Sequence, residues 1–183
     1  MISSPIQLLQ LSFKRINVNL DPRHAPAEAP NPLTNIFVFD GVSITAEFGF
    51  GQIEADHDRG RLFLVNLRTR VDNEPDPAVP ERQFAPYTID IEVTGVVLVP
   101  KGNEEIAPLE DLVSVNGAAL LWSATREQVL TLTSRMPIGP VMLPTVHFHD
   151  LKRQTGQEAA AAPQPVKAEK PARSVRRRKE PDA

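Results

Sequence analysis

The sequence predicts an α+β domain in which a four-stranded antiparallel sheet precedes the helices. Four segments within the first hundred residues alternate apolar and polar side chains with the period of a half-buried strand. The connectors over residues 21–35 and 72–86 are rich in turn residues and prolines, which exclude a crossover helix and favour antiparallel neighbours. Beyond residue 107 the apolar spacing changes to three and four residues, as in helices. Strands followed by helices are typical of the α+β class.

We expect the strands over residues 6–20, 36–50, 61–72 and 87–99. In the first strand the apolar positions change parity between Phe13 and Ile16, which indicates a β-bulge. Between the second and third strands, the segment EADHDRG carries acidic residues at alternate positions, as calcium loops do. It lacks the glycine at the sixth position and the glutamate at the twelfth. A hairpin turn is therefore the better interpretation.

Two helices are expected after the sheet. Pro108 suits a first helical turn, Glu110 and Asp111 suit the positive end of the helix dipole, and Gly117 suits the end of a short helix. A longer helix follows and ends before Pro137, and an extended C-terminal segment completes the fold. The apolar residues of the longer helix are expected in the core or in an oligomer interface: Leu121, Trp122, Val129 and Leu132.

Charge divides the chain of 183 residues into a domain over residues 1–151 and a tail over residues 152–183. The domain is acidic and the tail is basic, although the net charge is only −3. Because the tail is rich in alanine, proline and cations and has almost no large apolar residue, we expect it to be disordered. Its cations would be the phosphate contacts of a nucleic-acid or anionic-surface binder: Arg173, Arg176, Arg177, Arg178 and Lys179. The tail has no aromatic residue to stack on a base, and the acidic domain would repel phosphate, so nucleic acid is not the expected partner.

Several classes of function are disfavoured. The chain has no cysteine, which excludes disulfides, thiolate nucleophiles and thiolate metal ligands and favours a cytoplasmic protein. The N-terminus lacks the features of a signal peptide, and no segment has the length and apolarity for membrane insertion. His147 and His149 would project from one face of an extended segment, but the sequence suggests no third ligand. We therefore expect no metal, no cofactor and no enzymatic activity.

Three stretches near the end of the domain resemble the SecB family of protein-export chaperones. They are LLWSATRE (residues 120–127), Ser134-Arg135 and LPTVHFHDL (residues 143–151). Their spacing is close to that of the family's Pro-Tyr-Ala-Arg-Glu, Ser-Arg-Gly and Leu-x-Pro-Val-Asn-Phe-Asp motifs. Upstream, FKRINVNLDP occupies the place of the family's first strand, and four strands precede the helices. These motifs cover roughly the last third of the domain, and the remainder agrees with the family in layout.

The resemblance implies a homotetramer, built as a dimer of dimers, that holds unfolded polypeptides or preproteins in apolar grooves without ATP, cofactor or catalysis. It also makes SecA a candidate partner in protein export. Aromatic rings offer wide contact areas, and flexible methionines adapt to varied sequences. We expect the client-binding groove to contain Phe37, Phe39, Ile44, Phe48, Phe50, Met136, Ile138, Met142 and Leu143.

Departures from the family pattern favour an alternative function. Ser123-Ala124 stand where the family has Pro-Tyr, Met136 replaces a glycine, and His147 and His149 replace asparagine and aspartate. The basic tail also replaces the acidic end of the exporters that work with SecA. The alternative is a specialised SecB-like chaperone dedicated to one partner, as are the relatives linked to toxin–antitoxin systems.

Overall fold

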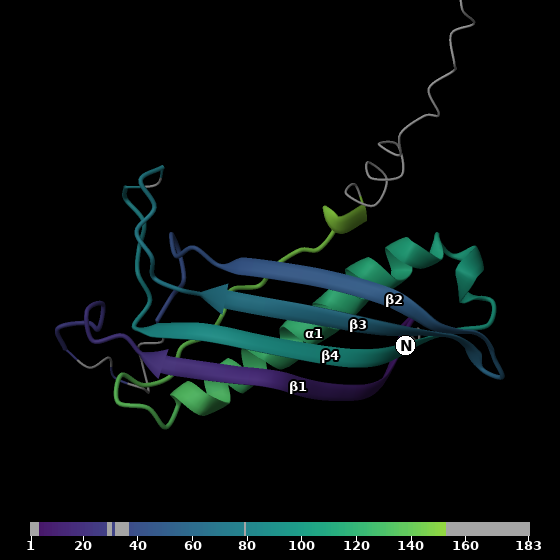
Figure 1. The fold of residues 1–183 in the computed structure, drawn as a ribbon, viewed down its shortest axis with the longest axis horizontal. Coiled ribbons are helices and arrows are strands. Elements are labelled where there is room, and N and C mark those ends of the chain that lie inside the picture. The colour runs from purple at the N-terminus through teal and green to yellow at the C-terminus, as the bar shows by residue number, and fades with distance from the viewer. Residues whose placement is uncertain (1–3, 29–30, 32–36, 79, 153–183) are drawn as a thin grey trace, which may run out of the picture.

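The computed structural model describes residues 4–28, 31, 37–78 and 80–152, and within them a four-stranded sheet carries one long helix on one face (Figure 1). The strands are β1 (Gln7–Leu20), β2 (Thr45–His57), β3 (Gly60–Val71) and β4 (Tyr87–Pro100). They are followed by a 3₁₀ turn, η1 (Asn103–Glu105), and by α1 (Leu109–Thr133). All strand pairs are antiparallel, in the order β1-β4-β3-β2. The expected α+β class and the antiparallel sheet are confirmed.

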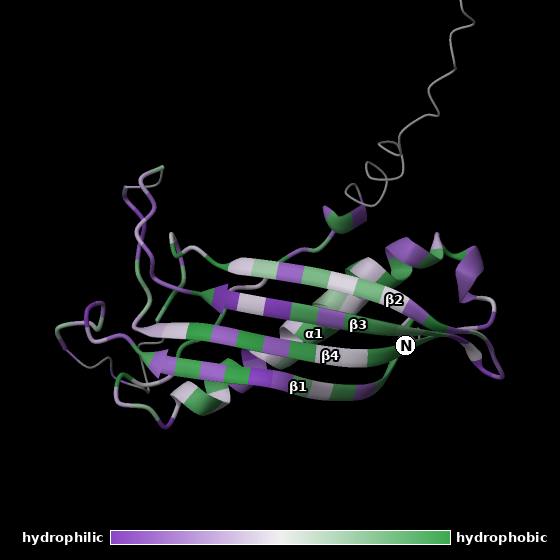
Figure 2. Ribbon diagram, viewed as in Figure 1, coloured by the Kyte–Doolittle hydropathy of each residue, from purple (hydrophilic) through white to green (hydrophobic). Residues whose placement is uncertain are grey.

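The alternation of side chains explains how the sheet is covered. Along β3 and β4 the odd-numbered residues, such as Val65, Leu67 and Ile91, are buried beneath α1, while the even-numbered ones point to the other face. Figure 2 shows this as an alternation of hydrophobic and hydrophilic bands along the strands. The predicted bulge in β1 is also confirmed, because the pairing of β1 with β4 shifts register between Phe13 and Arg15. A second shift lies between Leu8 and Gln10.

The second strand differs from the prediction. It begins at Thr45 rather than near residue 36 and continues to His57, where the predicted hairpin turn to β3 is confirmed. The cause is the Asp40-Gly41 turn, in which Gly41 has a φ of 74° and the strand cannot continue. The residues that flank this turn contribute single bridges: Phe37, before it, pairs with Val141, and Val42, after it, pairs with Gln83. Ile36 lies outside the described residues.

The prediction of two consecutive helices is wrong, because α1 is continuous through Gly117. Gly117 does not end the helix but lies where α1 passes close to the sheet. A Cβ atom built at this position would lie 3.2 Å from Cγ1 of Val65 and 3.6 Å from Cζ of Phe48. The absence of a side chain therefore lets the helix pack closely against β3 and β2.

The predicted boundary of the domain lies near the end of the described chain. Residues 151–152 are helical, and residues 153–183, which make up the rest of the expected tail, lie outside the described residues. Among the residues that the structure describes, no helix has the length and apolar character needed to cross a membrane.

Candidate functional site: an apolar groove beside β1

An apolar stripe runs along β1 on the face of the sheet that carries α1. Opposite residues in an antiparallel pair share a face, so the partners of the buried side of β4 belong to this stripe. They are Leu8, Leu11, Phe13, Ile16, Val18 and Leu20. Phe13 and Val18 pack against the core, whereas Ile16 remains 41% exposed and Leu8, Leu11 and Leu20 are each 37% exposed. The stripe is therefore a long apolar surface that the described chain leaves partly uncovered.

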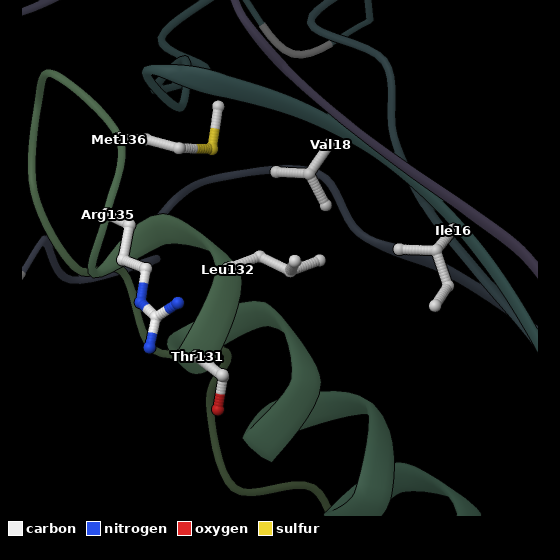
Figure 3. Close-up of a pocket in the computed structure, with 6 residues that line it drawn as sticks. All are labelled: Ile16, Val18, Thr131, Leu132, Arg135 and Met136. Atoms are coloured by element: carbon white, nitrogen blue, oxygen red, sulfur yellow. The ribbon is translucent and has the colours of Figure 1, made fainter.

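The position of α1 explains why the stripe is uncovered. The helix crosses the sheet diagonally, and its contacts are mainly with β3 and β4 (Figure 1). The C-terminal end of α1 lies beside β1, and there it forms one wall of a groove with a volume of about 430 Å³. The lining residues are Ile16, Val18, Thr131, Leu132, Arg135 and Met136. In Figure 3, Leu132 points toward the two strand residues, whereas the side chain of Arg135 extends toward Thr131.

Partly buried hydrogen bonds hold the chain after α1 against the helix. Nε1–H of Trp122 donates to the carbonyl oxygen of Pro144 at 2.9 Å, and Nε–H of Arg126 donates to that of Leu143 at 2.8 Å. The indole ring of Trp122 also lies edge-on to Phe148, with ring centroids 6.1 Å apart. The chain after α1 is thus held along one side of the helix, and it leaves the side toward β1 open.

A second set of hydrogen bonds holds the loop that carries Met136. The hydroxyl of Thr133 accepts a hydrogen bond from the amide of Val141 at 3.0 Å and donates to a carbonyl of its own helix. The hydroxyl of Tyr87 accepts from the amide of Ile138 and donates to the carbonyl of Gly139, both at 3.1 Å. Each of the two hydroxyls both donates and accepts a hydrogen bond. The loop that carries Met136, which forms one wall of the groove, is therefore anchored to the core.

The face of the sheet opposite α1 carries charged side chains that neutralise one another. Arg68 donates two hydrogen bonds to the carboxylate of Asp90, at 2.9 and 3.0 Å, and Arg15 donates a third at 3.0 Å. Arg70 forms an ion pair with Glu47. The hydrogen bonds from Arg68, and secondarily from Arg15, lower the pKa of Asp90 to about 2. This face is therefore charge-balanced rather than acidic.

The low pKa of Asp90 predicts an acid-sensitive contribution to stability. Because the carboxylate is favoured in the folded state, its stabilisation is complete above pH 5 and is lost as the pH falls from about 4 through 2. Asp90→Asn is expected to lower the free energy of unfolding by about 1 kcal/mol at pH 7, the scale of a partly exposed pair. The difference from the wild type should shrink toward pH 2.

Urea unfolding between pH 7 and pH 2 measures this difference. Asp58→Asn, in the exposed hairpin turn, removes a carboxylate outside the Asp90 ion pairs and controls for the change in net charge. An Asp90→Asn deficit that stays constant down to pH 2 would exclude the proposed linkage.

The structure distributes the predicted groove residues over several places. Phe48 and Phe50 are half-buried on β2, at the edge of the sheet opposite β1. Phe39 and Leu143 are in the core, at 5% and 0% exposure, so neither forms part of an open surface. Phe37, Ile138 and Met142 are half-buried in or beside the segment after α1, and Ile44 is half-buried just before β2. Met136 alone among the residues predicted to bind clients lines the groove beside β1.

The residues expected in the core or an interface divide in a similar way. Leu121, Trp122 and Val129 are buried, as expected for a core. Leu132 is half-buried and lines the groove. His147 and His149 are exposed, with ring centroids 6.5 Å apart, and the described part of the chain contains no cluster of three or more His, Cys, Asp or Glu side chains that could hold a metal.

The groove residues on β1 were missed by the sequence analysis. Their alternation was visible, but the two bulges place Leu8, Leu11 and Ile16 on one face despite their mixed parity. The length and apolar character of this edge strand could have indicated a binding surface, because exposed apolar edge strands must be covered or must pair with a partner.

Comparison with protein families and curated proteins identifies no relative of this chain. No protein-family model matches the chain, and no curated protein matches it.

Proposed function

We propose that the protein is an ATP-independent holdase chaperone of the SecB-like type, which binds unfolded or preprotein segments on the apolar groove beside β1. The observation that carries the proposal is the exposed apolar stripe of β1 and its continuity with the groove under the end of α1. Contiguous exposed apolar surface is uncommon and marks interaction sites. The acidic charge of residues 1–151 would keep a protein with such an exposed apolar surface in solution.

The shape of the stripe suits an extended polypeptide. β1 has 14 residues, so the stripe is about 45 Å long at the rise of a strand. An unfolded segment of about a dozen residues has the same length when extended. The groove itself combines two branched side chains, a leucine and a methionine, and such a surface accepts varied apolar residues.

Assembly into a dimer of dimers is part of the proposal. Helix α1 carries apolar side chains around much of its circumference, and three of them remain half-buried: Val115, Leu120 and Leu130. Neighbouring copies would therefore have apolar surface of α1 to cover. In such a tetramer, part of the stripe would contact another copy and the groove beside it would remain for clients.

The face opposite α1 bears on the proposed partners. Export through SecA would be favoured by an acidic face that attracts a basic partner, but here Arg15, Arg68 and Arg70 neutralise Asp90 and Glu47. This balance favours the alternative, a specialised SecB-like chaperone dedicated to one partner. A general holdase suppresses the aggregation of unrelated denatured proteins, whereas a dedicated one protects a single protein.

Leu132→Asp tests the groove directly. Because the substitution replaces an apolar wall by a carboxylate, we expect the affinity for a reduced, carboxymethylated unfolded protein to fall at least about tenfold, equivalent to about 1.4 kcal/mol. Fluorescence anisotropy without ATP measures the affinity.

Two further variants control this experiment. Ser134→Asp adds the same charge at the same end of α1 but on an exposed position outside the groove, and it should retain wild-type affinity. Ile16→Asp changes an exposed position of the opposite wall and should reproduce the loss if Leu132→Asp fails to fold. Failure of the wild type to bind any unfolded protein, together with no protection of a dedicated partner, would reject the proposal.

A further inference from the structure

The rim of the groove carries a single cation. Arg135 is the only charged side chain among the lining residues, and it is exposed. It forms no ion pair with any residue that the structure describes. By contrast, Arg15, Arg68 and Arg70 are all paired with carboxylates on the other face. The guanidinium of Arg135 is thus available to a group that enters the groove.

The surroundings of Arg135 favour an anion. The backbone carbonyl groups near the guanidinium already accept hydrogen bonds from backbone amides. The carbonyl of Leu132 accepts from the backbone amide of Arg135, and the carbonyl of Thr133 accepts from the backbone amide of Met136. The other walls are apolar apart from the hydroxyl of Thr131. A guanidinium presents several donors that match the two oxygens of a carboxylate, and a nearby apolar wall strengthens such a contact by reducing hydration.

We propose that Arg135 makes the groove selective for client segments in which an apolar stretch is followed or preceded by an acidic residue. The apolar side chains lie against Ile16, Val18 and Leu132, and the carboxylate contacts the guanidinium at the rim. This selectivity rests on the proposed holdase function and adds a chemical class of preferred client to it.

The form of the groove favours a polypeptide over a small amphiphile such as a fatty acid. Sites for small ligands enclose most of the ligand surface. This groove instead continues into the exposed stripe of β1, which extends about 45 Å over 14 residues. An extended chain can occupy the whole surface and still place one carboxylate at Arg135.

The test uses three labelled peptides that share one apolar sequence and carry Glu, Gln or Lys next to it. For the wild type we expect the Glu peptide to bind about two- to fivefold more tightly than the Gln peptide, the range of an exposed ion pair. Arg135→Gln should abolish this difference, and Arg135→Glu should bind the Lys peptide most tightly. The difference should also decrease in salt, because both charges are near solvent.

Lys101→Gln is the matched control, because it removes one exposed positive charge far from the groove residues in sequence and outside the lining set. It should leave the preference for the Glu peptide unchanged. Urea unfolding of each variant verifies that the fold is retained.

The outcomes separate the two proposals. If none of the peptides and no unfolded protein binds the wild type, and no dedicated partner is protected, the holdase function fails. If a dedicated partner is protected but none of the peptides binds, the holdase function stands and the selectivity is rejected. If the peptides bind with equal affinity to the wild type and to both Arg135 variants, the holdase function stands and the selectivity is rejected. If dodecanoate binds in an Arg135-dependent way while the peptides show no charge preference, the groove selects a small amphiphile and the proposed selectivity for acidic client segments is likewise rejected.

Discussion

Asn73→Ala is expected to destabilise the fold by about 4 kcal/mol, because buried hydrogen bonds and a left-handed backbone depend on this side chain. Asn73 is 1% exposed and has a φ of 59°. Its amide donates to the carbonyl of Ala85 at 2.7 Å, and its carbonyl oxygen accepts from the amide of Ala85 at 3.0 Å. It thereby joins the end of β3 to the chain that enters β4. Alanine would leave both backbone groups of Ala85 buried and unpaired.

Asn73 also connects these strands to the end of β1. The side-chain amide of Asn73 donates a hydrogen bond to the carboxylate of Asp21 at 3.3 Å. The backbone amide of Asp21 in turn donates to the carbonyl of Pro86 at 2.8 Å. The side chain of Asp21 accepts hydrogen bonds from Arg23, which hold its pKa well below the usual range. Loss of Asn73 therefore loosens three strand ends at once.

Asn73→Gly is the matched variant. Glycine loses the same side-chain hydrogen bonds but accepts a positive φ, so we expect it to be about 1 kcal/mol more stable than the alanine variant. Urea unfolding monitored by circular dichroism measures both. Unsatisfied buried polar groups each cost about 1 to 3 kcal/mol. If Asn73→Ala lowered the free energy of unfolding by less than about 1 kcal/mol, the assigned hydrogen bonds would be contradicted.

Local patterns were sufficient to predict most of the sheet. The alternation over β3 and β4 gave their bounds closely, and the parity change after Phe13 gave the bulge of β1. The start of β2 was missed because an apolar alternation continues through the Asp40-Gly41 turn. The continuity of α1 was missed because Gly117 has the composition of a helix stop, while its role depends on contacts with Val65 and Phe48 that lie distant in sequence.

The candidate site was less predictable than the fold. Side-chain chemistry selected phenylalanines and methionines, yet burial decides which of them are available, and burial depends on tertiary packing. Phe39 and Leu143 were thus assigned to a groove but are covered, whereas Ile16 and Leu132 face it. The diagonal crossing of α1, which leaves β1 open, follows from the close approach at Gly117 and from the hydrogen bonds of Trp122, and neither has a signature in the sequence.

Gly60→Ala is expected to destabilise the fold by about 3 kcal/mol through combined steric overlap and backbone strain. Gly60 begins β3 after the hairpin turn and has a φ of 148°. A Cβ atom at this position would lie 2.0 Å from the carbonyl oxygen of Val99 and 2.9 Å from the Cα atom of Pro100. Both are backbone atoms of the neighbouring strand, so relief requires β3 and β4 to separate at this end. Thermal and urea unfolding measure the loss.

Gly102→Ala separates the two causes. Gly102 also has a positive φ, 89°, but a Cβ atom there would meet no atom within 4 Å. Only the backbone cost should remain, which is about 1 kcal/mol. The further loss in Gly60→Ala, about 2 kcal/mol, then reports the steric overlap with β4. Equal losses in the two variants would mean that β3 and β4 do not approach this closely at Gly60, and the pairing of Gly60 with Pro100 would have to be revised.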